Sequence, residues 1–597
     1  MAHDYIDINT LKFLLYEVHS GDEILNGERY AMHDHDAMNM MIESVRDFCD
    51  AELFPFIKEF DVKPARYEDG SIKIHPQLGK AYKQGAELGM IAGSFEEKEG
   101  GFQLPRLFFS AMHMIANAAN NHVPGYWGLT MGSADLIATF GSEDLKQTFL
   151  PNMLSGKWQG TMCLTEPQAG SSLSDVITRA QPTDDDHYLI QGQKIFISAG
   201  DHEYADNVVH LLLARIEGAP EGTRGISLFV VPKKRGDSLD NNDVITASEF
   251  EKMGQKGYCT THLLFGEQDN CHGYLVGEPH QGLKYMFKMM NAARIDVGLG
   301  AAAIASAAYY ASLNYAKERP QGRRVMDSGK KDVAQEQVLI TQHPDVRRLL
   351  YLQKGIAEGG MSLVLQASEY VDKLRIATTD DEKNKWQLLL EILTPMVKTY
   401  PSEAGKRSTD AAVQVLGGYG FLMDYTPQQF YRDIRIFSLY EGTTGIQSLD
   451  LLGRKITMND GAATKLLMEE IMKTINRANQ YDELLTYTVQ LQDALAHVQL
   501  VVKHLMQFAQ QGQFERFTAD ASIFMEFLST VVVAWQWLKI GIAASQNGIE
   551  EQTEFYQSKI HCMKFFFRYE LPATKGLYDT LLRENSLTIV GDGPDPS

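Results

Sequence analysis

The sequence lacks the short motifs that mark several large classes of enzyme. No Walker A phosphate loop, HExxH zinc motif or GxSxG nucleophile elbow occurs in its 597 residues. The phrase nearest to the glycine-rich dinucleotide fingerprint, Gly417-Gly418-Tyr419-Gly420, follows a predicted helix instead of a strand, which is the wrong context for that fold. Phosphate-loop, zinc-protease, serine-hydrolase and Rossmann-type chemistry are therefore unsupported.

Cysteine is scarce and unpatterned. The chain has five cysteines, an odd number, with no CxxC pair among them. This usage favours a reducing compartment without a disulfide framework and gives no zinc-ligand spacing. We therefore expect a cytoplasmic protein with no metal site.

Basic residues are fewer than acidic ones, and no apolar run is long enough to cross a membrane. The net charge is −21, which makes nucleic acid a poor partner, because the field of the protein repels phosphate backbones. The most apolar run, Phe527–Leu538, falls short of the ~20 residues that span a bilayer. It predicts a buried helix, and we expect no integral membrane span. The N-terminus carries no basic region typical of a secretory signal.

Hydrophobic patterning divides the chain into helical and strand-rich parts. Apolar residues at helical spacing dominate before and after a middle region, where short alternating or β-branched runs indicate strands. This order predicts an α+β fold with segregated layers. The predicted parts are an N-terminal extension, an N-terminal helical domain, a middle β domain, a helical bundle and an additional C-terminal helical domain, at 1–37, 38–158, 159–276, 277–456 and 457–597.

Three segments carry residues suited to binding or catalysis. Cys163–Ser172 sets hydroxyls around a Pro/Gly turn, where they and free backbone N–H groups can bind a polar ring or a pyrophosphate, although an ordinary turn has the same composition. Gly192–Ser198 ends a predicted strand with Phe196, which suits either stacking on an aromatic ligand or a place in the core. Glu441 precedes Gly442 and two threonines typical of a helix N-cap, so it is a candidate general base or merely a capping glutamate.

Together and in this order, the three segments resemble the acyl-CoA dehydrogenase family. CLTEPQAGSS is similar to the first signature of that family, and QVLGGYGF…RDIRIFSLYEGTTGIQ is similar to the second. The resemblance covers about Met38 to Ile456. The chain length, the C-terminal helical addition and the N-terminal phrase DINTLKFLLYEV further resemble the extended branch, which includes very-long-chain and methylthiopropanoyl-CoA dehydrogenases.

The resemblance implies FAD as cofactor and a set of residues that bind it. Thr165 would bond the pyrimidine side of the flavin, Phe196 would pack on its ring where many relatives have Trp, and Ser198 would reach N5. Arg319 would grip the pyrophosphate, often from the neighbouring subunit, although the phrase that follows it departs from the family pattern. The implied cofactor-binding residues are Met162 (Tyr in many relatives), Leu164, Thr165, Ser171, Phe196, Ser198, Arg319, Gln414, Gly417, Gly418, Thr443 and Gln447.

The resemblance also implies a base. Glu441 matches the family base in Tyr-Glu-Gly, whereas the alternative position used by some branches is occupied here by Ala293. Arg294 would orient or charge the site. The implied substrate contacts are Ser171, Tyr440, Glu441 and Gly442.

The function implied by the resemblance is dehydrogenation of an acyl-CoA thioester to the trans-2-enoyl-CoA, with electrons passed to an electron-transfer flavoprotein, in a homodimer. Two alternatives stay open, an acyl-CoA oxidase that uses oxygen and a non-catalytic flavoprotein of the same fold. Oxidases of this length carry Thr-Glu-Leu-Gly-His-Gly where this chain has Thr-Glu-Pro-Gln-Ala-Gly. A DNA-binding relative would require a basic region after Leu452, and this region is not basic. Both observations favour the dehydrogenase.

Overall fold

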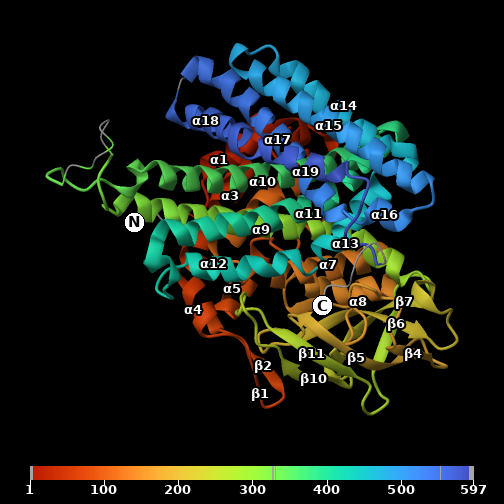
Figure 1. The fold of residues 1–597 in the computed structure, drawn as a ribbon. Helices are drawn as coiled ribbons and strands as arrows, with labels where there is room; N and C mark the ends of the chain where they lie inside the picture. Colours follow the sequence, from red (N-terminus) through yellow and green to blue (C-terminus); the bar gives the residue numbers. More distant parts are fainter. Residues whose placement is uncertain (1–4, 326–328, 330, 332, 552, 591–597) are drawn as a thin grey trace. The chain divides into compact units, whose positions relative to one another are not determined.

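The computed structural model describes residues 5–325, 329, 331, 333–551 and 553–590. The chain forms two compact units. Met32–Asp296 forms one, which we call the strand unit, and Met1–Ala31 together with Val297–Ser597 forms the other, the helical unit. The predicted N-terminal extension (1–37) is therefore divided: its part up to Ala31 belongs to the same compact unit as the C-terminal half of the chain (Figure 1), and the part from Met32 belongs to the strand unit.

The strand unit begins with helices whose ends follow from their capping residues. The Asp34 carboxylate accepts a hydrogen bond from the Ala37 N–H, and Ser142 caps a later helix in the same way. These helices are α3 (His35–Phe48), α4 (Ile57–Val62), α5 (Pro76–Glu87), α6 (Arg106–Ala119), α7 (Pro124–Phe140) and α8 (Glu143–Leu154). The sequence did not predict a hairpin, formed by β1 (Arg66–Glu68) and β2 (Ser71–Lys73). It turns at Asp69-Gly70, where both residues have positive φ.

An eight-stranded sheet follows in the described part of this unit. Seven strands lie in the order β10-β11-β5-β12-β7-β6-β3, and β4 pairs with β5 and β6. The strands are β3 (Trp158–Cys163), β4 (Arg179–Pro182), β5 (Tyr188–Ser198), β6 (Asn207–Ile216), β7 (Ile226–Pro232), β10 (Val244–Glu249), β11 (Thr260–Phe265) and β12 (His272–Leu275). Alternating or β-branched runs of the middle region form β5, β6 and β7, and this region is confirmed as strand-rich.

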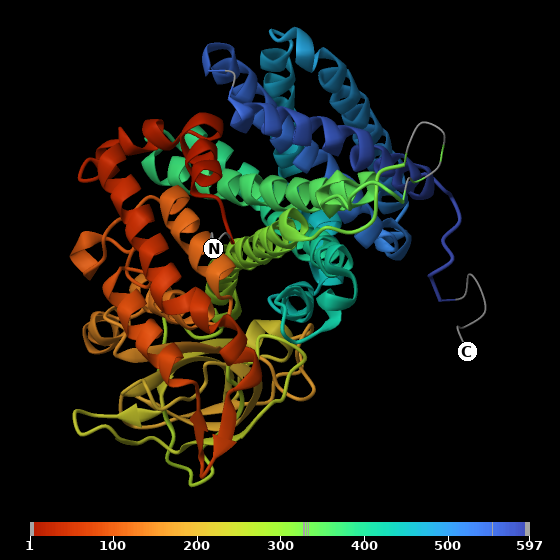
Figure 2. The ribbon, with the colours of Figure 1, turned by 90° about the vertical axis from the view of Figure 1, so that its left-hand side faces the viewer.

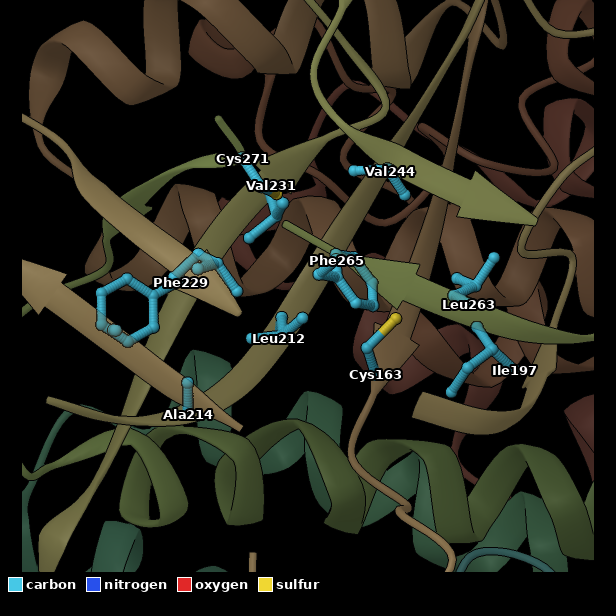
Figure 3. Packing of buried hydrophobic residues seen from close by; sticks show 12 residues of the cluster. Cys163, Ile197, Leu212, Ala214, Phe229, Val231, Val244, Leu263, Phe265 and Cys271 are labelled. Atoms are coloured by element: carbon cyan, nitrogen blue, oxygen red, sulfur yellow. The ribbon is translucent and has the colours of Figure 1, made fainter. Parts of the chain in front are cut away.

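The core of the sheet is apolar on both sides of β7, where every residue is buried. Figure 3 shows Cys163, Leu212, Phe229, Val231 and Phe265 gathered between the strands. A parallel pairing of β3 with β6 sets Met162 opposite Leu211. A rigid sheet therefore supports the segment that follows Cys163.

The helical unit is built on long helices. These are the part of α9 (Gly282–Glu318) from Val297 onward, α10 (Pro344–Ile376), α11 (Asp380–Leu416), α12 (Pro427–Asp433) and α13 (Thr444–Asp450). Helices α10 and α11 lie side by side (Figure 1). A proline inside a helical pattern predicts an interruption of the helix, but α11 is continuous through Pro401. Pro401 frees the Val397 carbonyl, and Gly298 packs so closely on that oxygen that an added Cβ would lie 2.1 Å from it, which keeps the carbonyl covered.

The C-terminal addition consists of α14 (Met458–Ala478), α15 (Leu485–Gln510), α16 (Phe514–Thr518), α17 (Ala521–Glu551), α18 (Glu554–Tyr569) and α19 (Thr574–Leu581). Within α17, the stretch Ala521–Asn547 is long and apolar enough to cross a membrane, yet 89% of its most apolar window is buried inside the structure. The apolar run at 527–538 is thus the core helix of this addition, as the sequence predicted.

The N-terminal segment fastens the bundle to the C-terminal addition inside the helical unit. It comprises α1 (Ile8–Phe13), a π-helical turn and α2 (Gly21–Leu25). Tyr30 donates a hydrogen bond to Asp372 of α10 at 2.7 Å, and Lys559 of α18 donates to Thr10 at 2.6 Å. Figure 2 shows this segment in red beside the green α10.

Candidate active site

Glu441 occupies a backbone conformation that side chains rarely adopt. Its φ is +53°, and Gly442 follows with φ +86°. Two successive left-handed residues turn the chain sharply just before α13. Thr443 then caps that helix by accepting the Ile446 N–H, as the sequence predicted. A glutamate held in a strained turn is more typical of a functional site than of a helix cap, because capping requires no such conformation.

Two side chains hold the carbonyl groups of this turn. Gln447 Nε2 donates to the Glu441 carbonyl at 3.0 Å, and Lys398 Nζ of α11 donates to the Gly442 carbonyl at 2.8 Å. Lys398 is fully buried. The Gln447 Oε1 atom is buried and has no hydrogen-bond partner among the residues that the structure describes, so it is a ready acceptor for a ligand.

A cavity of about 430 Å³ lies in the helical unit beside the GGYGF phrase. Its wall includes four residues that the sequence singled out for cofactor binding: Arg319, Gln414, Gly417 and Gly418. A Cβ added to either glycine would meet no atom within 4 Å, so the backbone at this wall is open to a ligand. The Arg319 guanidinium lies over the Tyr419 ring at 5.7 Å, so the wall of the cavity carries a cation.

Phe196 and Thr165 lie together in the strand unit. The Ile195 N–H donates to the Thr165 carbonyl at 2.9 Å, which ties the segment after β3 to the end of β5. Phe196 has φ +58° and is 59% exposed as a residue. Among the ring contacts of the described residues, its ring packs only against Phe250, at 4.8 Å. The core interpretation of Phe196 is therefore wrong, and an exposed aromatic face is present instead.

The hydroxyl groups next to this ring are available. Neither Thr165 nor Ser198 uses its side chain in a hydrogen bond to any residue that the structure describes. Both are half-buried, and Ser198, the last residue of β5, pairs with Thr260 of β11 through the backbone. Met162 and Leu164 are half-buried, whereas Ser171 is exposed at the far end of the turn. The strand unit thus brings together Thr165, Phe196 and Ser198.

A buried ion pair fixes this surface, and the sequence did not predict it. Lys194 Nζ lies 2.8 Å from Glu166 Oε1 and donates to the Leu164 carbonyl at 3.0 Å. Glu166 also accepts hydrogen bonds from Ile177 and Thr178. Burial raises the pKa of Glu166, but the Lys194 ammonium and these hydrogen bonds outweigh it and hold that pKa below its usual value. Lys194 lies in a predicted strand, but its neighbour Gln193 is polar, so no local pattern marked the lysine as buried.

Arg294 lies in the strand unit, buried on α9, and its Nη1 donates to Asn291 Oδ1 at 3.2 Å. Tyr440 lies in the helical unit with its ring edge-on to Phe437 at 5.4 Å. The predicted residues thus divide into two sets. One set belongs to the strand unit, and the set around Glu441 and the cavity belongs to the helical unit.

The sequence matches domain models along most of its length. Models of the acyl-CoA dehydrogenase N-terminal, middle and C-terminal domains match residues 35–157, 161–267 and 280–456. A model described as acetyl-CoA dehydrogenase C-terminal like matches residues 467–589. The chain belongs to the acyl-CoA dehydrogenase family.

Similar proteins agree with this assignment. The chain is 35% identical over 572 residues to a 3-methylmercaptopropionyl-CoA dehydrogenase of Ruegeria pomeroyi, which covers 95% of this chain and 94% of that one. It is 31% identical to a broad-specificity linear acyl-CoA dehydrogenase of Mycobacterium tuberculosis, with 97% and 98% covered. A Bacillus anthracis acyl-CoA dehydrogenase solved with FAD shares the fold, with a TM-score of 0.72, 21% identity and coverage of 92% and 88%.

The protein is therefore an FAD-dependent oxidoreductase that acts on acyl-CoA, and its residues fit that cofactor. The exposed Phe196 ring with the free hydroxyls of Thr165 and Ser198 suits a flat ring edged with polar atoms. The open glycines and the Arg319 cation suit a pyrophosphate, and the buried acceptor of Gln447 suits an amine or hydroxyl donor. When bound, FAD supplies a two-electron acceptor, and the protein supplies orientation and electrostatics.

Proposed function

We propose that this acyl-CoA dehydrogenase removes the hydrogens of the α and β carbons of an acyl-CoA thioester, giving the trans-2-enoyl-CoA, with an electron-transfer flavoprotein as the final electron acceptor. The observation that carries the proposal is the Glu441 turn. It combines a carboxylate, a strained left-handed backbone and carbonyl groups held by Lys398 and Gln447.

In this mechanism Glu441 is the general base that removes the α-proton. A thioester α C–H is a weak acid, so the base must be held in place and the developing enolate oxygen must be stabilised by a fixed donor. The Glu441 backbone N–H is that donor. Its direction is set by the left-handed φ of the same residue. One residue thus provides both the base and the hydrogen bond.

The relatives reported above are named dehydrogenases, which supports a protein acceptor over oxygen. The phrase Thr-Glu-Pro-Gln-Ala-Gly, in place of the oxidase phrase, points the same way. We further propose a homodimer in which the cavity near Arg319 receives part of the cofactor of the other copy. Molecular mass in solution tests the dimer, and peroxide formed during turnover would contradict the protein acceptor.

The test of the base is Glu441→Gln, which keeps the size of the side chain and removes its basicity. We expect the anaerobic bleaching of the bound yellow flavin by acyl-CoA to slow by at least ~10², with FAD content unchanged. The matched control is Glu570→Gln, a largely buried carboxylate of the helical unit that pairs with Arg407. A Glu441→Gln protein that bleaches at the normal rate would remove Glu441 from the mechanism. A panel of thioesters in the same assay identifies the preferred acyl chain.

A further inference from the structure

The side chain of Lys398 is fully buried and ends on the turn that carries Glu441. It comes from the middle of α11, 44 residues before its acceptor, and its Nζ lies 2.8 Å from the Gly442 carbonyl oxygen. Burying an ammonium is costly, and the hydrogen bond to the Gly442 carbonyl offsets part of that cost. The question is therefore what this hydrogen bond does for the turn formed by Glu441 and Gly442.

The turn cannot hold its shape by local backbone preferences alone. Glu441 adopts φ +53° without the freedom of a glycine, and Gly442 at φ +86° can adopt either hand. Hydrogen bonds to two successive carbonyl groups, from Gln447 and Lys398, fix the orientation of the two peptide planes that follow the Cα atoms of Glu441 and Gly442. Of the two donors only Lys398 is charged, and hydrogen bonds from a charged donor are the stronger kind.

We propose that Lys398 is a positioning residue for catalysis, which acts by holding the Glu441-Gly442 turn so that the carboxylate and the backbone N–H of Glu441 stay aligned for proton removal. This inference rests on the proposed role of Glu441 as the base. Lys398 itself transfers no proton. Without its ammonium, the Gly442 carbonyl would lose its donor and the turn could relax toward ordinary φ values.

The test is Lys398→Met, which keeps the length and burial of the side chain and removes the donor. We expect the anaerobic rate of flavin bleaching to fall ~10-fold or more, since small misplacements of a reacting group cost up to ~10²-fold. KM should stay within about threefold, and so should the amount of FAD bound per chain, because neither depends on the alignment of the base. The isotope effect with α-deuterated substrate should rise, since proton removal becomes the slower step.

A double variant separates positioning from general damage. If Lys398 acts through Glu441, adding Lys398→Met to Glu441→Gln should slow the residual rate less than threefold, since the aligned group is already absent. An equal loss in both backgrounds would overturn the proposal. If Glu441→Gln were fully active, the proposed base would fail. If it were inactive while Lys398→Met stayed normal, only the present inference would fail.

Two further variants complete the experiment. Lys455→Met is the matched control, a nearly buried lysine of the same unit that pairs with Glu391, and it should lower stability without changing the isotope effect. Should Lys398→Met not fold, Lys398→Gln keeps a polar group too short to reach the carbonyl and should show the same loss of rate. Colourless, unfolded protein from both variants would assign Lys398 to folding alone and overturn the proposal.

Discussion

Phe196 has a combination of properties that ordinary strand packing does not produce. Its backbone lies in the left-handed region at φ +58°, the residue is 59% exposed, and it lies where β5 and β11 change register. A left-handed conformation of a bulky residue costs about 1–3 kcal/mol. Because little packing offsets this cost in the strand unit, we propose that the strained backbone serves to present the ring to the flavin.

This strain gives a prediction that reverses the usual order of substitutions in strands. Phe196→Gly should leave the cofactor-free protein about 1 kcal/mol more stable than Phe196→Ala, because glycine adopts positive φ without penalty. Both variants should bind FAD roughly tenfold more weakly, since a stacked aromatic contact contributes about 1.5 kcal/mol at most. Denaturant unfolding and flavin titration measure the two effects. Leu239 also has positive φ and lies in the turn that joins the paired residues Lys234–Arg235 and Asp240–Asn241. The glycine and alanine variants at this position should differ in stability but bind FAD equally well.

The segment between β3 and β4 owes its conformation to one buried ion pair. Lys194 reaches from β5 to Glu166, and both side chains are almost completely buried. Lys194→Met should cost about 3–5 kcal/mol of stability, because it leaves a buried carboxylate without its cation. The double variant Lys194→Met/Glu166→Gln should recover much of this loss, since the amide oxygen still accepts from Ile177 and Thr178. Thermal unfolding measures both, and additive losses would contradict the pairing.

Elements with periodic patterns could be predicted from the sequence, whereas long-range contacts could not. The runs that form β5, β6 and β7 alternate or are uniformly apolar, and the Thr443 cap follows a local rule. The continuity of α11 through Pro401 depends on such a long-range contact, because Gly298 on another helix covers the carbonyl that the proline frees. The buried positions of Lys194 and Lys398 were not predicted for a similar reason. Their partners lie 28 and 44 residues away, and only the folded chain shows that these lysines are buried.

The helical unit is held together by a polar cluster that joins three distant parts of the chain. His19 of the N-terminal segment lies 3.0 Å from Glu369 of α10, and Lys539 of α17 lies 3.4 Å from the same imidazole nitrogen of His19. His19 also bonds Ser362 at 3.1 Å. The cluster makes the N-terminal segment a structural part of the bundle and of the C-terminal addition. Conditions that charge His19 should therefore loosen all three parts together.

Acid should weaken the helical unit through His19. Burial, reinforced by the Lys539 ammonium, lowers the pKa of His19 from 6.5 to about 4, although Glu369 opposes this. The unfolded chain therefore binds a proton more readily than the folded one between these values. The contribution of His19 to stability is complete above about pH 6.5 and is lost as the pH falls toward 4. Between about pH 7.5 and about pH 5 the loss should reach about 2 kcal/mol.

Hydrogen exchange of the α10 and α17 amides measures this loss, because it reports the free energy of local opening. In His19→Gln, which cannot titrate, the difference in opening free energy between the two pH values should shrink by about 2 kcal/mol. The matched control His35→Gln replaces an exposed histidine of the strand unit and should leave the difference unchanged. An unaltered pH dependence in His19→Gln would mean that acid acts through other groups. The N-terminal segment would then contribute to the helical unit by packing alone.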